Sequence, residues 1–313
     1  MKLFKSIRTN KWTIIALGLS LTLMSKVEAQ QRPVFSQYMF NTLAINPAYA
    51  GSQDQLRASA VLRNQWVNLE GAPQTQTLSA HTSLPRKNIG LGMMLYRESI
   101  GVHSDLGLYL SYAYQIKFKR KRRLAMGLQM GFNNLLSDFN ELNSYDVNDP
   151  VIGYFKNFNP NFGTGVYYST PRFYAGVSVP YLINNKLISS KEGMLGKEGG
   201  EARYYFINSG YVFDAAPKVK IKPSVLVRFQ EGAPLGADLN INFFLHDLIN
   251  VGASWRTGDA VVFLTELYLN DNLSFGYSYD MITSSLHKYT RGSHELMLNY
   301  RMQLTPTPCH TYF

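Results

Sequence analysis

Two stretches between residues 106 and 132 alternate strictly between apolar and small or polar side chains. Residues 106–116 place Leu, Tyr or Ile at every even position, and residues 124–132 place Leu, Met or Phe there. Successive side chains of a β-strand point to opposite faces, so each stretch predicts a strand with one wholly apolar face. Strands of about 10 residues with this pattern can cross a bilayer at a tilt of about 45°. The pair, joined by the basic turn 117–123, indicates a transmembrane β-barrel.

The N-terminal end carries an export pattern. Basic residues precede an apolar run at 12–24, and Val27-Glu28-Ala29 offers a small-x-small cleavage site. This layout predicts a secretory signal peptide at residues 1–29 and a mature chain that starts near Gln30. The apolar run is shorter than the roughly 20 residues of a transmembrane helix. If the chain meets a membrane, strands must cross it.

Charge and cysteine content exclude some classes of function. The formal net charge of +10 falls to +6 in the expected mature chain, because the signal peptide holds five of the 31 basic and one of the 21 acidic residues. Such an excess in an exported chain does not favour a nucleic-acid partner. The single cysteine, Cys309, cannot form an internal disulfide.

Candidate strands follow one another at short intervals from residue 56 onwards, separated by turn residues. Their number is even, as expected of a bacterial barrel with both chain ends on the periplasmic side. The fourteen expected strands are 56–66, 74–84, 89–97, 106–116, 124–135, 161–169, 172–179, 202–213, 219–229, 237–245, 248–256, 260–269, 272–280 and 294–303.

The lengths of the connections support a barrel over a soluble sandwich. If the first strand runs outward, every even-numbered connection must be a short periplasmic turn. These connections read 85–88, 117–123, 170–171, 214–218, 246–247 and 270–271. The three longest connections, 137–160, 180–201 and 281–293, all fall in the outward set. Nothing in a sandwich requires this parity.

The expected fold class is all-β, an antiparallel transmembrane β-barrel of about 14 strands in the cell outer membrane. The barrel spans residues 54–303 and is followed by a C-terminal tail at 304–313. A lead-in segment at 30–53 precedes it and carries little strand pattern. This segment either tucks into the barrel or lies on its periplasmic side.

Two sets of residues are candidates for partner contacts. On the periplasmic side, the basic turns are either solvated turns at the lipid headgroups or a docking surface for a periplasmic partner; these residues are Arg86, Lys87, Lys119, Arg120, Lys121, Arg122 and Arg123. On the outer side, long loops without evident structure often have a function. Their candidate cargo-facing residues are Asp138, Tyr145, Asp149, Tyr154, Phe155, Lys191, Glu192, His287 and Tyr289.

The polar faces of the strands make predictions about the lumen. Lys220, Lys222 and Arg228 lie on the polar face of strand 219–229, and pointing them into lipid would cost about 2–4 kcal/mol each near the midplane. We therefore expect them to face a wet lumen. Pro223 in the same strand predicts a bulge or local break. Bulky inward residues, namely Tyr109, Tyr167 and Tyr174, help to fill the interior.

No motif for catalysis, metal binding or a cofactor emerges. The six histidines are scattered without metal-ligand spacing. Gly90-Leu91-Gly92 and Gly163-Thr164-Gly165 lack the Lys-Ser/Thr of a phosphate loop, and we expect these glycines either to make room inside the barrel or to ease its curvature. The expected protein is not an enzyme. A lipid-modifying enzyme would need a catalytic constellation that the sequence does not display.

Several stretches together resemble the PorP/SprF family of type IX secretion system membrane proteins. The longest is Gln37-Tyr38-Met39-Phe40-Asn41, which continues through residues 43–51 as LAINPAYAG. The others are Arg63-Asn64-Gln65-Trp66 leading into EGAP at 70–73, Gly90-Leu91-Gly92 followed by Ile100-Gly101, and FYAGVSVP at 173–180. The resemblance covers essentially the whole expected mature chain.

That resemblance implies an outer-membrane component of a secretion and gliding apparatus. Its expected partners are a secreted cargo protein with a C-terminal sorting domain, periplasmic ring lipoproteins or other secretion-system components, and outer-membrane lipid. The family supplies no catalytic residues. The competing class is a porin or small-solute transporter, because a barrel of this size can enclose a lumen and the lumen-facing basic residues would favour anions.

Overall fold

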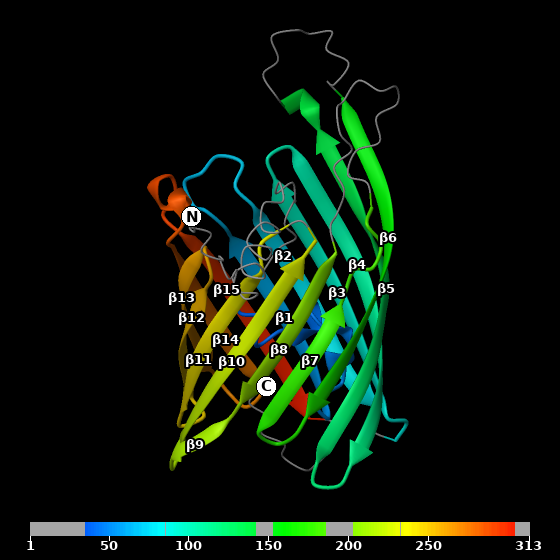
Figure 1. Cartoon of the computed structure of the whole chain (residues 1–313), viewed down its shortest axis with the longest axis vertical. Coiled ribbons are helices and arrows are strands. Elements are labelled where there is room, and N and C mark those ends of the chain that lie inside the picture. Colours follow the sequence, from blue (N-terminus) through cyan, green and yellow to red (C-terminus); the bar gives the residue numbers. More distant parts are fainter. Residues whose placement is uncertain (1–34, 85, 142–152, 186–202, 232, 304–313) are drawn as a thin grey trace, which may run out of the picture.

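The computed structural model describes residues 35–84, 86–141, 153–185, 203–231 and 233–303, which form a closed antiparallel β-barrel (Figure 1). Each strand pairs with its neighbours in sequence, except that β8 and β9 both pair with β10 and not with each other, and β1 pairs with β15 to close the wall. The strands are β1 (Gln55–Asn64), β2 (Gln74–Leu84), β3 (Ile89–Ile100), β4 (His103–Phe118), β5 (Arg122–Asp138), β6 (Tyr154–Ser169), β7 (Phe173–Val179), β8 (Tyr204–Tyr211), β9 (Phe213–Ala216), β10 (Val219–Gln230), β11 (Gly236–Leu245), β12 (Ile249–Arg256), β13 (Ala260–Tyr268), β14 (Leu273–Ile282) and β15 (Ser293–Gln303).

The fifteen strands make a barrel of fourteen, because β8 and β9 are two parts of one strand interrupted at Val212. Both parts pair with β10. The irregularity expected at Pro223 therefore lies mainly in the neighbouring strand, formed by β8 and β9. Strand β10 runs on through Pro223 and keeps its register with β11, while the pairing towards β8 and β9 is interrupted beside Lys222 and Pro223.

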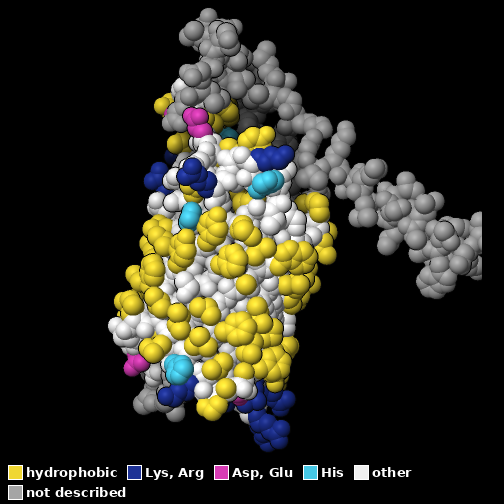
Figure 2. Space-filling view, turned by 90° about the vertical axis from the view of Figure 1, so that its left-hand side faces the viewer, with side chains coloured by type: hydrophobic (Ala, Val, Ile, Leu, Met, Phe, Trp, Pro, Cys, Tyr) yellow, Lys and Arg dark blue, Asp and Glu magenta, His cyan; other side chains and the backbone are white. Residues whose placement is uncertain are grey.

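The two faces of the wall have the chemistry that the alternation predicts. In β4, Leu110 and Tyr112 are 51% and 43% exposed on the outside, whereas Tyr109 and Ala113, on either side of this pair in the sequence, are fully buried on the inside. Figure 2 shows hydrophobic side chains over the middle of the outer wall, with Lys and Arg gathered towards its two ends. This is the surface of a barrel whose outer wall meets hydrocarbon. The expected outer-membrane barrel is confirmed.

The two rims of the barrel differ as the connection lengths predict. One, the turn rim, carries only short connections, including the hairpin turn at Lys119–Lys121, where Arg120 and Lys121 have positive φ. The other, the loop rim, carries the connections 139–153, 180–203 and 283–292. Because outer-membrane barrels keep short turns in the periplasm and longer loops outside, the loop rim faces the cell surface.

One side of the wall rises above the rest at the loop rim (Figure 1). Strands β4, β5 and β6 have 16 or 17 residues, whereas β7 has 7. The expected loop at 137–160 was too long, since Ser137–Asp138 belong to β5 and Tyr154–Pro160 to β6. Residues 154–160 contain two Asn residues and Pro160, which are common in loops, yet here the backbone continues as a strand. We call the parts of β4–β6 that rise above β7 the raised wall.

The lead-in segment lies inside the barrel. Nearly every residue from Phe35 to Gly51 is buried, and two 3₁₀ helices, η1 (Thr42–Ala44) and η2 (Pro47–Tyr49), stand within the lumen. We call residues 35–52 the plug. Of the two expected placements, the one inside the barrel is therefore right for this part of the segment. The expected signal peptide and C-terminal tail lie outside the described residues.

Candidate functional site

The plug runs through the lumen from one rim to the other. Its first described residues contact wall residues near the loop rim, such as Arg63 at the end of β1 and Glu295 at the start of β15. Its last residue, Ser52, accepts a hydrogen bond from Arg123 at the turn rim. The chain thus descends through the barrel before β1 begins. The alternative placement, on the periplasmic side of the barrel, does not hold for residues 35–51, because the wall encloses nearly all of their side chains.

Buried charges hold the upper end of the plug. The backbone N–H groups of Ser36 and Gln37 each donate to the Glu295 carboxylate at 2.9 Å. The Ser36 hydroxyl donates to Asp280 at 2.7 Å and accepts from Arg63 at 2.8 Å. Arg63 also bridges both carboxylates, at 2.7 Å to Asp280 and 3.1 Å to Glu295. All three charged side chains are at most 2% exposed.

The same network continues around the lumen. Arg256 lies 3.4 Å from Asp280 and 3.5 Å from Asp238, and Arg228 lies 2.8 Å from Asp238. We call the six wall residues the polar clamp; they are Arg63, Arg228, Asp238, Arg256, Asp280 and Glu295. Three positive and three negative side chains balance one another. Balance matters because a buried charge is tolerated only when it is paired and hydrogen-bonded.

Small residues let the plug approach the wall in the middle of the barrel. A Cβ on Gly127 would lie 2.4 Å from the Cα of Ala48, and one on Gly90 would lie 1.9 Å from the carbonyl oxygen of Ala50. The prediction that the glycine at position 90 makes room inside the barrel is confirmed. Asn46 fixes the same region, since its side chain donates to the Val166 carbonyl at 3.1 Å.

The lower end of the plug is held by fewer and more exposed contacts. Gln115 donates to the carbonyl oxygens of Ala50 and Gly51, at 3.3 Å and 2.5 Å. Arg123 forms an ion pair with Asp54 at 2.5 Å, and these two side chains are 18% and 24% exposed. Arg123 was expected at a periplasmic partner surface. In the structure it is already engaged in fixing the entry to β1.

The other expected periplasmic residues gather at the turn rim. Arg86 and Lys87 are exposed in the β2–β3 turn. The rest are exposed at the β4–β5 hairpin; they are Lys119, Arg120, Lys121 and Arg122. Apart from a bond from the Arg122 side chain to the Lys119 carbonyl, they project from the wall into solvent. They form an exposed basic surface at the turn rim.

The expected cargo-facing residues occupy two parts of the loop rim. Tyr154 is 70% exposed at the top of β6, while Phe155 packs edge-on against Phe139. Asp138 caps the neighbouring 3₁₀ turn by accepting from Asn140. The second part is the β14–β15 connection, where His287 and Tyr289 are exposed. The remaining candidates lie outside the described residues; they are Tyr145, Asp149, Lys191 and Glu192.

The three basic residues of β10 have different environments. Lys222 is fully buried, with its ammonium 5.4 Å from the ring centres of both Phe40 and Phe244. Arg228 belongs to the polar clamp. Lys220 lies near the turn rim and pairs with Asp214 at 2.8 Å, where both side chains are partly exposed. The lumen around Lys222 is filled by the plug and is not an open anion path.

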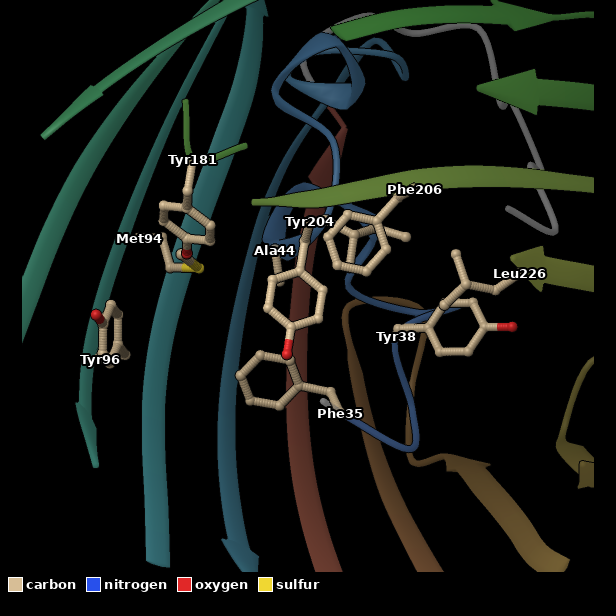
Figure 3. A pocket seen from close by; sticks show the side chains of 10 residues that line it. Phe35, Tyr38, Ala44, Met94, Tyr96, Tyr181, Tyr204, Phe206 and Leu226 are labelled. Carbon is tan, nitrogen blue, oxygen red and sulfur yellow. The ribbon is translucent and has the colours of Figure 1, made fainter. Parts of the chain in front are cut away.

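Two small cavities lie between the plug and the wall. One cavity of about 40 Å³ lies between Phe35, Tyr38 and Ala44 of the plug and an apolar part of the wall (Figure 3). A second, of about 50 Å³, lies beside Phe40 nearer the turn rim. Volumes of this size hold a few water molecules. Tyr109, Tyr167 and Tyr174, which were expected to fill the interior, are at most 4% exposed.

Of the polar clamp, only Arg228 was among the residues expected from the sequence to have a role in the lumen. A signal for the clamp was present, because acidic and basic residues stand on the inward faces of several strands near their loop-rim ends, as Arg63, Arg256 and Asp280 do. The alternation pattern could not show that these three side chains lie at the same height in the barrel and contact the same plug residue, Ser36. In the described part of the chain, no group of three or more His, Cys, Asp or Glu side chains is placed to hold a metal. No described helix is long and apolar enough to cross a bilayer.

Comparison with known proteins identifies one family and several solved structures with low sequence identity to this chain. Residues 27–300 match the family described as type IX secretion system membrane protein PorP/SprF. No curated protein sequence matches the chain. Among solved structures, the Acinetobacter baumannii outer membrane protein Omp33 is similar at 10% identity, with 80% of this chain and 100% of that chain covered and a TM-score of 0.47. The Ralstonia pickettii toluene transporter TbuX is similar at 8% identity, with coverages of 87% and 94% and a TM-score of 0.49.

Proposed function

Because the chain belongs to the PorP/SprF family of type IX secretion system membrane proteins, we propose that it is a non-enzymatic anchor in the outer membrane. In this proposal the loop rim binds a secreted cargo protein through its C-terminal sorting domain. The turn rim meets periplasmic ring lipoproteins or other components of the secretion and gliding machinery.

The observation that carries the proposal is the occupied lumen. A porin needs a continuous wet path, whereas here the plug contacts the wall from Ser36 at the loop rim to Ser52 at the turn rim. The plug belongs to the same chain and is held by hydrogen bonds to buried charged side chains of the wall. A barrel filled in this way serves as a rigid support, so its working surfaces are its two rims.

The rims offer surfaces suited to different partners. The loop rim presents the raised wall, with exposed aromatic side chains such as Tyr154 and Phe158. Aromatic side chains bury large areas in protein interfaces. The turn rim presents the basic residues of the β2–β3 and β4–β5 turns, which favour a partner with an acidic surface.

The test removes part of the loop rim without disturbing the wall. The N–H of Phe139 donates to the carbonyl of Gly153 at 3.0 Å, so the two ends of the β5–β6 connection already lie together. Replacing residues 142–152 with a short Gly-Ser turn should leave the barrel folded and weaken capture of the secreted cargo. Undiminished capture by the folded variant would contradict this loop assignment.

A second measurement separates the anchor from a porin. The purified wild-type barrel should give no steady conductance in a planar bilayer. A variant lacking residues 35–50, assembled to the same heat-modifiable mobility, should conduct. Steady conductance by the wild-type protein would favour the porin and argue against the anchor.

A further inference from the structure

Four polar side chains project from the outer face of the wall towards the loop rim. We call them the outer polar patch; they are Asn64 of β1, Gln74 and Gln76 of β2, and Arg97 of β3. All four are exposed and occupy outward positions, since Gln76 stands two positions from the exposed Leu78, and Arg97 two positions from the exposed Leu95. The outer face of these strands therefore changes from apolar to polar near its upper end.

The strand register brings the four side chains together. Asn64 lies opposite Gln74, and Gln76 lies opposite Arg97. Side chains that face each other across antiparallel strands have Cβ atoms about 5 Å apart, and diagonal neighbours are about 7–8 Å apart. Within the described part of the chain, none of the four has a side-chain hydrogen bond or an ion pair to another residue. One guanidinium and three amides thus form a single patch that can bind a ligand.

The patch lies where the outer wall leaves the hydrocarbon. A tilted strand needs about 9–11 residues to cross the hydrocarbon. The basic β2–β3 turn marks the lower boundary, and above it residues 84 to 74 of β2 cover eleven positions and residues 89 to 97 of β3 cover nine. This count places the patch at the outer boundary of the membrane. A charged side chain is tolerated there but not at the midplane, so the patch meets the lipid headgroups.

The patch occupies only one sector of the wall. Outer-membrane barrels generally carry a girdle of aromatic side chains at this height. Elsewhere the outward residues near the loop rim are aromatic or apolar, as Phe229 in β10, Trp255 in β12 and Met281 in β14 show. In β1–β3, amides and a guanidinium stand in their place. A uniform membrane boundary does not require this difference, so it points to a ligand bound in this sector.

Exposed leucines lie directly beneath the patch. Leu78 and Leu95 face each other one row below Gln76 and Arg97, and Leu62 lies opposite Gln76 on β1. Acyl chains attached to a headgroup at the patch would extend downward over these side chains. The polar patch above an apolar surface therefore matches an amphiphilic lipid.

The chemistry of the patch selects the kind of headgroup. A guanidinium matches two phosphate oxygens with two parallel hydrogen bonds. Amide side chains both donate and accept hydrogen bonds, and they suit the hydroxyl and amide groups of a sugar. None of the four residues is acidic, so a cationic headgroup finds no partner among them.

We propose that the outer polar patch binds an outer-leaflet lipid whose headgroup is a phosphorylated sugar. Arg97 holds the phosphate, the three amide side chains hold the sugar, and the acyl chains lie over the leucines. The inference goes beyond the proposed function, because it requires neither a cargo protein nor a periplasmic partner. Such a lipid attaches one defined side of the barrel to the outer leaflet.

Native mass spectrometry of the purified protein tests the inference, with monophosphoryl lipid A added in detergent as the probe. We expect one lipid to stay bound to the wild type when the detergent is removed. Arg97→Gln removes the charge and both parallel hydrogen bonds, so the affinity should fall about ten-fold or more. Arg97→Lys keeps the charge but loses the planar fork, and the loss should be about three-fold. Gln76→Ala should also weaken binding about three-fold, because it removes one amide partner.

Lys156→Gln is the matched control. It removes a charge from another exposed residue of the wall near the same rim, in β6. The affinity for lipid A should change by less than about two-fold, because an exposed charge that does not contact the ligand has a weak effect. Heat-modifiable mobility establishes that each variant has assembled. If Arg97→Gln does not assemble, Arg97→Lys and Gln76→Ala decide the test.

Two further probes identify the ligand. Phosphatidylglycerol has a phosphate but no sugar, and glucosamine 1-phosphate has both but no acyl chains. Each should bind more weakly than lipid A, and equal binding of either one would overturn the proposed ligand class. No retention of lipid A by the wild type, equal retention by Arg97→Gln, or an equal loss in Lys156→Gln would overturn the inference. A membrane protein that copurifies with the wild type but not with Arg97→Gln, while no lipid is retained, would show a protein contact instead.

Discussion

The two ends of the plug are fastened in different ways. At the loop rim, Ser36 and Gln37 are held by the polar clamp, whose charges are almost completely enclosed. At the turn rim, the fastening is the Arg123–Asp54 ion pair, which is about one fifth exposed, together with the bonds from Gln115. The upper end of the plug, which is separated from β1 by more residues than the lower end, thus has the stronger set of contacts.

Chain connectivity explains the difference. The lower end continues directly into β1 at Gln55, so the covalent chain already confines it and little conformational entropy is lost when it docks. The upper end has no such tether within the described residues. It must be fixed by side chains of the wall, and short charge-assisted bonds are the strongest available.

The comparison predicts the largest effect at the upper end. Arg63→Ala would leave Asp280 and Glu295 buried without their shared partner, and breaking a buried ion pair in this way typically costs about 3–5 kcal/mol. We expect the free energy of unfolding to fall by that order, together with faster proteolysis of the plug. Arg122→Ala, at an exposed position, is the matched control and should change stability by less than about 0.5 kcal/mol. Equal effects of the two variants would mean that the clamp does not fasten the plug.

An intermediate effect is expected in the middle of the lumen. Gly127→Ala places a Cβ within 2.4 Å of the Ala48 backbone, so either the plug or β5 must shift. Overpacking of this kind typically costs about 1–3 kcal/mol. The melting temperature in detergent should fall accordingly. The control is Ser111→Ala, on the inner face of β4. Another Gly→Ala change, Gly258→Ala, would not serve, because Gly258 has a φ of +70° and a side chain there would be strained. A fully neutral Gly127→Ala would show that the plug is loosely seated.

The smallest effect is expected at the lower end. Arg123→Ala removes the ion pair to Asp54 and the bond to the Ser52 carbonyl. Because both charged side chains are partly solvated, the loss should be about 1 kcal/mol or less, and it should diminish further at high salt. Measuring unfolding at low and high ionic strength checks both statements. A loss as large as that of Arg63→Ala would remove the asymmetry between the two ends.

Much of the wall could be predicted from the sequence. The inward and outward faces of β4 and β5 follow from a period of two, and the two kinds of rim follow from the parity of the connections. These are local signals, repeated many times along the chain. The error at 154–160 has a local cause as well, because Pro160 indicates a loop unless the strand is known to be an edge.

The plug and its clamp could not be predicted in the same way. Residues 35–52 lack strand alternation, and an irregular segment carries no sign of what encloses it. The clamp joins Ser36 to Glu295, which lie 259 positions apart. Charged residues on inward faces indicated a polar lumen, but their pairing depends on the strand register around the whole barrel.

The distribution of the clamp over the strands has a consequence for how the barrel is assembled. Arg63 comes from the first strand, but Asp280 and Glu295 come from β14 and β15, the last two to be synthesised. A chain that stops before β14 lacks both carboxylates that hold Ser36, and it also lacks the strand that closes the wall against β1. Plug capture and wall closure therefore depend on the same final segment. Only a chain complete through β15 can do both, so a truncated product would expose an unfastened plug to periplasmic proteases.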